Sequence, residues 1–340
     1  MSDVKSEIEV KIAFIADDIR IINEFELNHN ATFSLMLASQ DLGARVFLTE
    51  SNNLKILNSK VLAKFDEVSL RPSLHEHLKV KNTLECSLDS FNIIFARKDP
   101  PFNQNYLSYI YKLCLVEREN TLIVNEPQGI LKANEKLYAL NLDKLIPPTL
   151  VSANENEILS FLNEYKKVVI KPIFNKGGEG VSYLEEDSKD SISIIKKSIS
   201  GESRVALVQK YIPDIKAGDK RIILLNGDPL GFFSRVPKEG EFRANLDRGA
   251  SVKPYTPNKR DLEICEALKP YLQRDGLYFT SIDIIGEYLI EVNVTCPAGI
   301  REAERCMDKP LGKEIVGWAI KKALGSQPLV TSRIKRLSQS

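Results

Sequence analysis

The sequence predicts an α/β fold in which an N-terminal doubly wound α/β domain precedes a more antiparallel α+β half. Three patterns support this prediction. Short apolar runs alternate with amphipathic segments over the first 130 residues, Pro147-Pro148 interrupts the chain, and Gly-rich turns separate the later apolar runs. Alternating strands and helices are typical of a parallel sheet, whereas strands joined by short turns pair antiparallel.

The N-terminal elements follow in order from residue 12. The apolar run 12–16 indicates a buried parallel strand, and a helix that Thr32 caps and Gly43 ends leads to the next strand. This makes a βαβ unit, which two more strands extend. The expected elements are strands at 12–16, 46–48, 91–95 and 122–124 and helices at 33–42 and 106–116.

After the two prolines, Ser152 and Glu155 have capping-box spacing ahead of a short amphipathic helix that ends near Tyr165. Strands are expected at 168–170, 205–208, 221–225, 281–285 and 289–295.

Composition excludes several classes of protein. The 340 residues have a net charge of +1, which gives no overall basic surface for nucleic acid. No stretch approaches 18 apolar residues, so no transmembrane helix is expected, and the charged start lacks a signal-peptide core. The five cysteines show no C-x-x-C spacing. We therefore expect a cytoplasmic protein with reduced thiols.

A Gly-rich loop follows the predicted strand that ends at Lys171. Three glycines, Gly177, Gly178 and Gly180, allow the backbone to approach a ligand closely and to direct N–H groups at phosphate oxygens, and Lys176 adds charge. The loop matches neither the Walker pattern nor the dinucleotide fingerprint. An ordinary flexible hairpin remains the alternative.

Two acidic side chains face each other on the predicted hairpin 281–295. If Ile284 lies opposite Ile290 across a three-residue turn, Asp283 lies opposite Glu291, and Asn293 points the same way. Facing carboxylates repel unless a positive charge lies between them, and nothing along these two strands supplies one. Mg²⁺ prefers such oxygen ligands together with substrate phosphates. The hairpin therefore predicts a magnesium–nucleotide site, with a solvated polar face as the alternative.

Basic residues are concentrated in the C-terminal half around Gly- and Pro-rich loops. Arginine forks suit carboxylates and phosphates, so some of them are expected to form a substrate-anion site, although any one could be a surface residue. The candidates are Lys220, Arg221, Arg235, Arg243, Arg248 and Arg301.

Several short motifs occur together in an order that resembles the bacterial glutathione synthetases of the ATP-grasp superfamily. The resemblance covers roughly residues 11 to 325. Cys296 and Ala298 depart from the family pattern, which usually has Ser and a polar residue there. The motifs are Arg97–Phe102, Asn134–Leu137, Ile170–Gly178, Gln209–Pro213, Gly218–Arg221, Arg243–Leu246, Glu291–Thr295 and Pro297–Glu302.

The resemblance implies an ATP-grasp fold in three parts. An N-terminal α/β domain, 1–133, would help to hold a dipeptide. A central lid, 134–213, would carry the Gly-rich loop, and a C-terminal catalytic domain, 214–340, would carry metal and nucleotide. ATP would lie between the last two parts.

The resemblance also implies roles for individual residues. Those expected to bind ATP, including its adenine edge and ribose, are Lys136, Lys171, Lys176, Gly177, Gly178, Gly180, Gln209, Lys210, Tyr211, Ile212 and Asp219. Asp283, Glu291 and Asn293 would hold Mg²⁺, or Mn²⁺ in its place. Arg221, Arg235 and Lys171 would be catalytic, and Arg97, Arg243, Asn245 and Arg301 would bind substrate.

The implied reaction joins glycine to the C-terminal carboxylate of γ-glutamylcysteine through an acyl phosphate, with ATP as the phosphoryl donor. Small-molecule substrates, no nucleic acid, no membrane and a homo-oligomer, often a tetramer in the family, are the expected partners. Two alternatives stay open. One is another ATP-grasp carboxylate–amine ligase that adds an amino acid to a peptide or protein tail, and the other is a non-catalytic ATP-binding regulatory protein.

Overall fold

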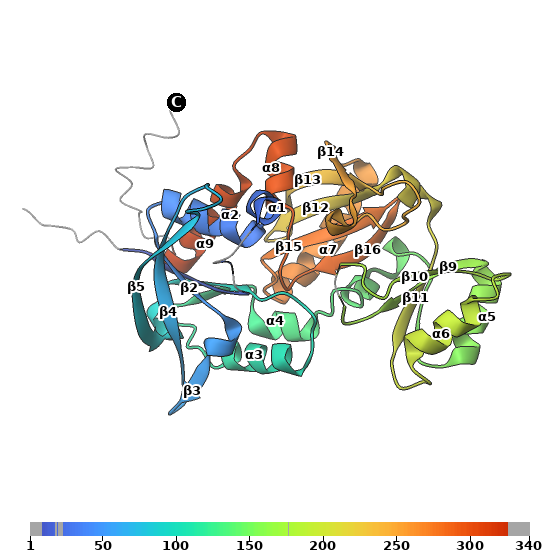
Figure 1. Cartoon of the computed structure of the whole chain (residues 1–340), viewed down its shortest axis with the longest axis horizontal. Coiled ribbons are helices and arrows are strands. Elements are labelled where there is room, and N and C mark those ends of the chain that lie inside the picture. The colour runs from blue at the N-terminus through green and yellow to red at the C-terminus, as the bar shows by residue number, and fades with distance from the viewer. Residues whose placement is uncertain (1–8, 18, 20–22, 176, 326–340) are drawn as a thin grey trace, which may run out of the picture.

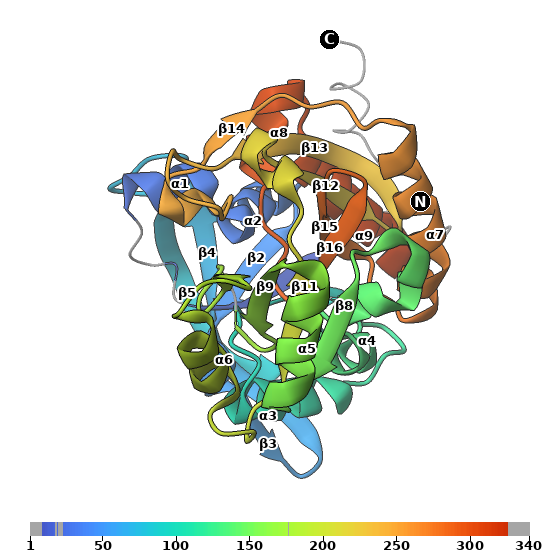
Figure 2. The same ribbon diagram turned by 90° about the vertical axis from the view of Figure 1, so that its right-hand side faces the viewer.

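The computed structural model describes residues 9–17, 19, 23–175 and 177–325. In these ranges the chain forms three sheets, which are built from three successive segments of the sequence. Figure 1 shows the four-stranded sheet at one end of the molecule, and Figure 2 views the molecule from that end.

The N-terminal sheet has the strand order β3-β4-β2-β1-β6-β7, and β5 pairs with β4. The strands β2, β1, β6 and β7 are parallel, as the sequence predicts, and have helices on both faces. The strands are β1 (Lys11–Ala16), β2 (Arg45–Thr49), β3 (Lys55–Leu57), β4 (Lys60–Leu70), β5 (Leu78–Ser87), β6 (Ile93–Arg97) and β7 (Leu122–Val124). The helices are α1 (Glu24–His29), α2 (Ala31–Asp41), α3 (Gln104–Cys114) and α4 (Pro127–Lys132).

Two predicted helix starts are wrong. Asn30, not Thr32, caps α2, because its side chain accepts a hydrogen bond from the Phe33 N–H, and Thr32 is buried inside the helix. In the middle of the chain Asn154 caps the helix in place of the expected Ser152–Glu155 pair. Asparagine is as strong an N-cap as serine and lies nearer to both helix starts.

The middle sheet has four antiparallel strands in the order β10-β9-β11-β8, with two helices on one face. Its elements are β8 (Thr149–Ser152), α5 (Glu155–Tyr165), β9 (Lys167–Pro172), β10 (Ser182–Glu185), α6 (Ser191–Ile199) and β11 (Ala206–Lys210). A 3₁₀ segment, η3 (Tyr138–Leu145), precedes it.

The C-terminal sheet has five antiparallel strands in the order β14-β13-β12-β15-β16. Its strands are β12 (Asp219–Leu225), β13 (Asp228–Val236), β14 (Ser251–Lys253), β15 (Phe279–Ile285) and β16 (Tyr288–Asn293), and its helices are α7 (Lys259–Arg274), α8 (Ile300–Met307) and α9 (Leu311–Leu324). The last described helix, α9, packs on α2 beside the N-terminal sheet, so a late segment of the chain completes the N-terminal domain.

Candidate active site

A cavity of about 510 Å³ lies where the three parts of the fold meet. The middle sheet contributes Lys171 and Gln209, the C-terminal sheet contributes Asp283 and Glu291, and helix α1 contributes His29. Side chains distant in sequence therefore face one space, as a site for a large polar ligand requires.

The acidic hairpin forms one wall. Asp283 on β15 pairs with Glu291 on β16, which confirms the predicted opposition of the two carboxylates. The predicted register is wrong only between Asp283 and the turn, where Ile284 pairs with Leu289 and a bulge after Asp283 absorbs the difference. The bulge allows a turn one residue shorter than the one expected, while both acids stay on the cavity face.

Arginines from neighbouring strands neutralise Asp283, which the sequence analysis did not foresee. Arg221 lies opposite Asp283 on β12 and donates to both carboxylate oxygens, at 2.8 and 2.7 Å. Arg235 on β13 approaches within 3.1 Å. The expectation that nothing along the two hairpin strands neutralises the acids holds, but strand pairing brings cations to Asp283 from β12 and β13, so Asp283 does not require a metal ion for neutralisation.

Asp219, expected to meet a ribose, pairs with a buried arginine instead. Arg235 donates to both of its carboxylate oxygens, at 2.8 and 2.5 Å. Asp219 lines the cavity, but both oxygens are used in orienting Arg235. Burial raises the pKa of Asp219 in spite of this arginine. At Asp283 the two arginines Arg221 and Arg235 outweigh the effect of burial and hold the pKa of the carboxyl below its usual range.

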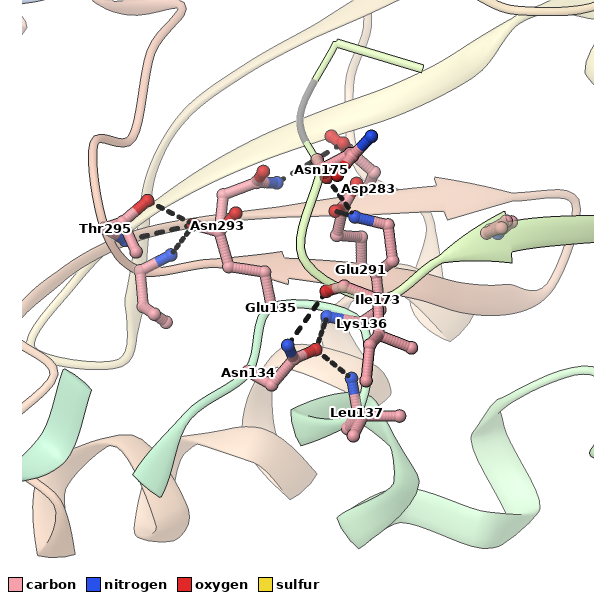
Figure 3. Close-up of polar contacts among 12 residues, drawn as sticks. Asn134, Glu135, Lys136, Leu137, Ile173, Asn175, Asp283, Glu291, Asn293 and Thr295 are labelled. Atoms are coloured by element: carbon pink, nitrogen blue, oxygen red, sulfur yellow. Dashed lines mark hydrogen bonds and ion pairs between the residues drawn. The ribbon is translucent and has the colours of Figure 1, made fainter. Parts of the chain in front are cut away.

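Figure 3 shows how the segment 134–137 ties the acidic hairpin to the Gly-rich loop. The Lys136 ammonium donates to the Asn175 carbonyl at 2.5 Å and lies 3.3 Å from a Glu291 oxygen. The Asn134 side chain donates to the Ile173 carbonyl at 2.8 Å. A phosphate bound between the loop and the hairpin would therefore be close to the Lys136 charge.

Glu135 is a cavity residue that the sequence analysis missed. It is desolvated and accepts hydrogen bonds from the Val294 and Thr295 N–H groups and from the Thr295 hydroxyl, at 2.9, 3.0 and 2.7 Å. Burial raises its pKa, and the charge of Glu291 raises it further. Its position beside Lys136 in a recognised motif was the signal that could have identified it.

The middle sheet supplies the opposite wall. Lys171 donates to the Gln209 side-chain oxygen at 2.6 Å, and burial lowers the pKa of Lys171 to about 8. Gln209, Lys210, Tyr211 and Ile212 all line the cavity, as expected for the residues assigned to the adenine edge. This wall offers a poorly solvated ammonium group that an added anion would stabilise.

The Gly-rich loop approaches the cavity from the same side. Gly177 and Gly178 line it, with φ values of +63° and +68° that favour glycine. Arg243 donates to the Gly178 carbonyl at 3.3 Å, and a Cβ at Gly178 would lie 2.8 Å from Asn245 Oδ1. Arg243 and Asn245 therefore lie against the loop as well as in the cavity.

Arg97, Arg301 and Gly180 do not line the cavity, and neither do two of the basic candidates, Lys220 and Arg248. Arg97 is buried and donates to Thr32 and to the Pro297 carbonyl, at 3.1 and 2.8 Å, so it ties β6 to the segment before α8. Lys176 lies outside the described residues. Sequence reasoning also missed cavity residues that come from α1, α8 and the loops: Phe25, His29, Asp99, Phe242, Asp247 and Glu302.

The residues at the hairpin fit a hard divalent cation only in part. No cluster of three His, Cys, Asp or Glu side chains occurs in the described ranges, so oxygen ligands from Asn293 or a bound phosphate would be needed. Glu291 and Asn293 both line the cavity. Asp283 already has four donors around its two oxygens, because the Asn293 amide lies 3.3 Å away in addition to the arginine contacts.

Two further observations limit the class of protein. No disulfide joins the five cysteines, all of which lie within the described ranges. Among the helices that the structure describes, none is long and apolar enough to cross a bilayer.

Comparison with known proteins identifies relatives over nearly the whole length. Residues 10–130 match the family model of the prokaryotic glutathione synthetase N-terminal domain, and 135–308 match that of its ATP-grasp domain. A glutathione synthetase of Synechocystis sp. is 39% identical over 318 residues, covering 91% of this chain and 98% of the relative. One from Coxiella burnetii is 32% identical over 310 residues, covering 91% and 96%.

Solved structures with the same fold are more distant in sequence. D-cycloserine synthetase DcsG superposes with a TM-score of 0.64 at 12% identity, covering 92% of this chain and all of that one. The macrocyclase MdnC from Microcystis aeruginosa, bound to its precursor peptide, gives 0.61 at 15% identity, covering 91% and 99%. These likenesses concern the fold alone, which is the ATP-grasp fold that the sequence predicts.

Proposed function

This chain belongs to the prokaryotic glutathione synthetase family of ATP-dependent ligases, and we propose that it joins glycine to the C-terminal carboxylate of γ-glutamylcysteine. As a family member it is an enzyme that uses ATP and a divalent metal ion on small-molecule substrates. The observation that best supports the proposed reaction is the convergence of four cations, each from a different segment, on one acidic hairpin. Lys136, Lys171, Arg221 and Arg235 all face the cavity that Glu291 lines.

ATP is proposed to bind between the middle and C-terminal sheets. Its adenine would lie against Gln209–Ile212, and its phosphates would lie between Lys171, Lys136 and the Gly177-Gly178 backbone. Mg²⁺, or Mn²⁺ in its place, would be held by Glu291 and Asn293. Asp283 would join them as phosphate oxygens draw Arg221 and Arg235 away from it. The metal, when bound, supplies charge neutralisation at the phosphates.

The dipeptide carboxylate is proposed to lie beside Arg221, Arg235, Arg243 and Asn245, which all line the cavity. A carboxylate is a poor electrophile, and transfer of the γ-phosphoryl group to one of its oxygens creates a good leaving group. Arg221 and Arg235 would stabilise the charge that develops during transfer. Arg97 and Arg301 are not retained as substrate ligands, because neither lines the cavity.

In the second step the neutral amine of glycine attacks the acyl carbon, the phosphate leaves with the electron pair of the carbon–oxygen bond, and the nitrogen gives up one proton to the released phosphate or solvent as the peptide bond forms. The acyl phosphate must be kept from water, since hydrolysis would waste ATP. The Gly-rich loop, tied to Arg243 and Arg248 by hydrogen bonds from their side chains to its carbonyls, is the segment we propose to exclude water. No covalent enzyme intermediate is required.

We also propose a cytoplasmic homo-oligomer, often a tetramer in this family. No disulfide joins any two of the five cysteines, which favours a reducing compartment. Light scattering coupled to size-exclusion chromatography would measure the assembly, and a monomer at micromolar concentration would contradict it.

The reaction is tested by following ADP release and product mass with ATP, Mg²⁺, γ-glutamylcysteine and a panel of amines. The expected result is one glutathione per ADP, with glycine as the preferred acceptor. Turnover with a peptide or another amino acid, but not with glycine, would favour a sibling ligase. Nucleotide binding without turnover on any acceptor would favour a regulatory protein.

A further inference from the structure

One buried carboxylate in the cavity wall, that of Glu302, has no role in the proposed reaction. Glu302, in the first turn of α8, lines the cavity and is only 1% exposed. Its Oε1 atom contacts His29 Nδ1 on α1 and lies 3.6 Å from a nitrogen of Arg305. Its Oε2 atom has no hydrogen-bond partner among the described residues.

A buried carboxylate oxygen without a partner costs free energy, and more than a neutral polar group would. Such a group is expected in a wall where a ligand supplies the missing donor. The partner should be cationic and small, since Oε2 offers a single acceptor atom and Oε1 is already engaged. One carboxylate oxygen is too few for a hard metal ion, which takes several oxygen ligands.

An aromatic ring adjoins this carboxylate. Phe25 stacks on His29, with ring centroids 4.2 Å apart, and lines the same cavity. Its side chain is 51% exposed, so its ring is open to a ligand. A cation is attracted electrostatically both to an aromatic face and to a carboxylate, so the two groups together favour a cationic ligand.

From these contacts we infer that Glu302, with His29 and Phe25, forms a subsite for a primary ammonium group of a substrate. The inference rests on the proposed function, in which both γ-glutamylcysteine and glycine bring an ammonium group and ATP brings none. Either the glutamyl α-ammonium or the glycine ammonium has the required chemistry. Glu302 is a specificity residue in this scheme, and His29 is a positioning residue that holds the Glu302 side chain.

The test compares wild-type enzyme with Glu302→Gln, which keeps the shape and removes the charge. The KM of the substrate whose ammonium is bound should rise about ten- to a hundredfold, as expected on losing a hydrogen bond to a charged group. The KM of ATP should stay unchanged. Glu304→Gln is the matched control, because Glu304 lies on the same helix but accepts from the Gly312 N–H and does not line the cavity.

Glutarylcysteine, the dipeptide without its α-ammonium, distinguishes the two sources. If the glutamyl ammonium is bound, wild-type enzyme should prefer γ-glutamylcysteine to glutarylcysteine at least tenfold in kcat/KM, and Glu302→Gln should lose that preference. If the glycine ammonium is bound, the preference should be unaffected and the KM of glycine should rise. Unchanged KM values for both substrates would overturn the inference.

Failure of the subsite can be told apart from failure of the proposed reaction. No turnover by wild-type enzyme would refute the reaction, and calorimetric binding of the dipeptide and of glutarylcysteine would then test the subsite directly. If Glu302→Gln does not fold, Phe25→Leu replaces it, because Phe25 is exposed. A several-fold rise in the same KM would support the subsite, and no rise would refute it.

Discussion

The middle sheet has a hydrophobic core of its own, whereas the N-terminal and C-terminal sheets share their cores. The core of the middle sheet contains residues of its own segment alone, such as Ile158, Ile170 and Ile195. The other two cores each combine both ends of the chain, so that Ile94 packs in one cluster with Ile282. The C-terminal helix α9 completes the second shared core.

This difference indicates which part of the molecule can move. A unit with its own core can rotate as a body without exposing apolar surface elsewhere, whereas separating two sheets that share a core exposes it. The cavity lies between the independent unit and the joint body, with Lys171 on one side and Glu291 on the other. Closure of the middle sheet over ATP is the motion that this construction permits.

The largest expected effect concerns the joint body. Arg235→Met should destabilise the protein by about 3–5 kcal/mol, because Asp219 and Asp283 would be left buried without their shared cation. Chemical denaturation monitored by circular dichroism would measure this loss. Arg71→Met, which removes an exposed pair with Glu76, should change stability little. Equal effects of the two substitutions would show that the buried network contributes nothing.

The independence of the middle sheet can be tested with a core truncation. Ile195→Ala should weaken that unit by about 2–5 kcal/mol, the usual cost of such a cavity. Hydrogen exchange should accelerate in 149–210 and stay unchanged elsewhere. Ile264→Ala, in a core shared by both ends of the chain, should instead accelerate exchange in both other sheets. Acceleration throughout the molecule by Ile195→Ala would contradict the division.

Catalysis is expected to depend on Glu291, which lies on the acidic hairpin where the middle sheet faces the C-terminal sheet. Glu291→Gln should lower kcat by on the order of 10²-fold or more with folding intact, since it removes the charge proposed to hold the metal and the partner of Lys136. Steady-state kinetics at saturating Mg²⁺ would measure it. Glu287→Gln, at the exposed turn of the same hairpin, is the control and should retain full activity. Unchanged activity of Glu291→Gln would remove the metal assignment.

The smallest expected effect is an uptake of protons when ATP binds. Lys171 has a pKa of about 8 because burial disfavours its charged form, so at pH 8.5 much of it is neutral. Phosphates bound nearby would raise this pKa, and ATP binding should therefore take up a fraction of a proton at pH 8.5 and almost none at pH 6.5. Calorimetry in two buffers of different ionisation enthalpy measures the uptake, which Lys171→Met should abolish. Uptake that persists in Lys171→Met would assign it to another group.

Sequence patterns predicted the parallel strands and the Asp283–Glu291 opposition because both follow from hydrophobic periodicity within one segment. They did not predict β5, which is largely exposed and lacks a buried stripe, and β4 was missed although its burial alternates along the strand. The arginines around Asp283 depend on β12 and β13 lying beside the hairpin. That strand order is set by tertiary packing, which periodicity does not encode.

The cavity residues also divide into those that local sequence motifs identify and those that only tertiary packing brings to the cavity. Those within recognisable motifs, such as Lys136 and Gln209, were predicted from the sequence. His29 and Phe25 were not, because they reach the cavity only through the packing of α1 on α8. Arg97 lies in a motif close to the site but does not line the cavity, because its guanidinium donates to Thr32 and to the Pro297 carbonyl between β6 and the segment before α8.

The central claim is that ATP activates a substrate carboxylate in this cavity, and transfer of an oxygen label tests it most directly. γ-Glutamylcysteine labelled with ¹⁸O in its C-terminal carboxylate would be turned over with ATP, Mg²⁺ and glycine, and the released phosphate analysed by mass spectrometry. If the acyl phosphate forms, each phosphate retains one labelled oxygen from the carboxylate. Phosphate released without label, while glutathione accumulates, would contradict the account.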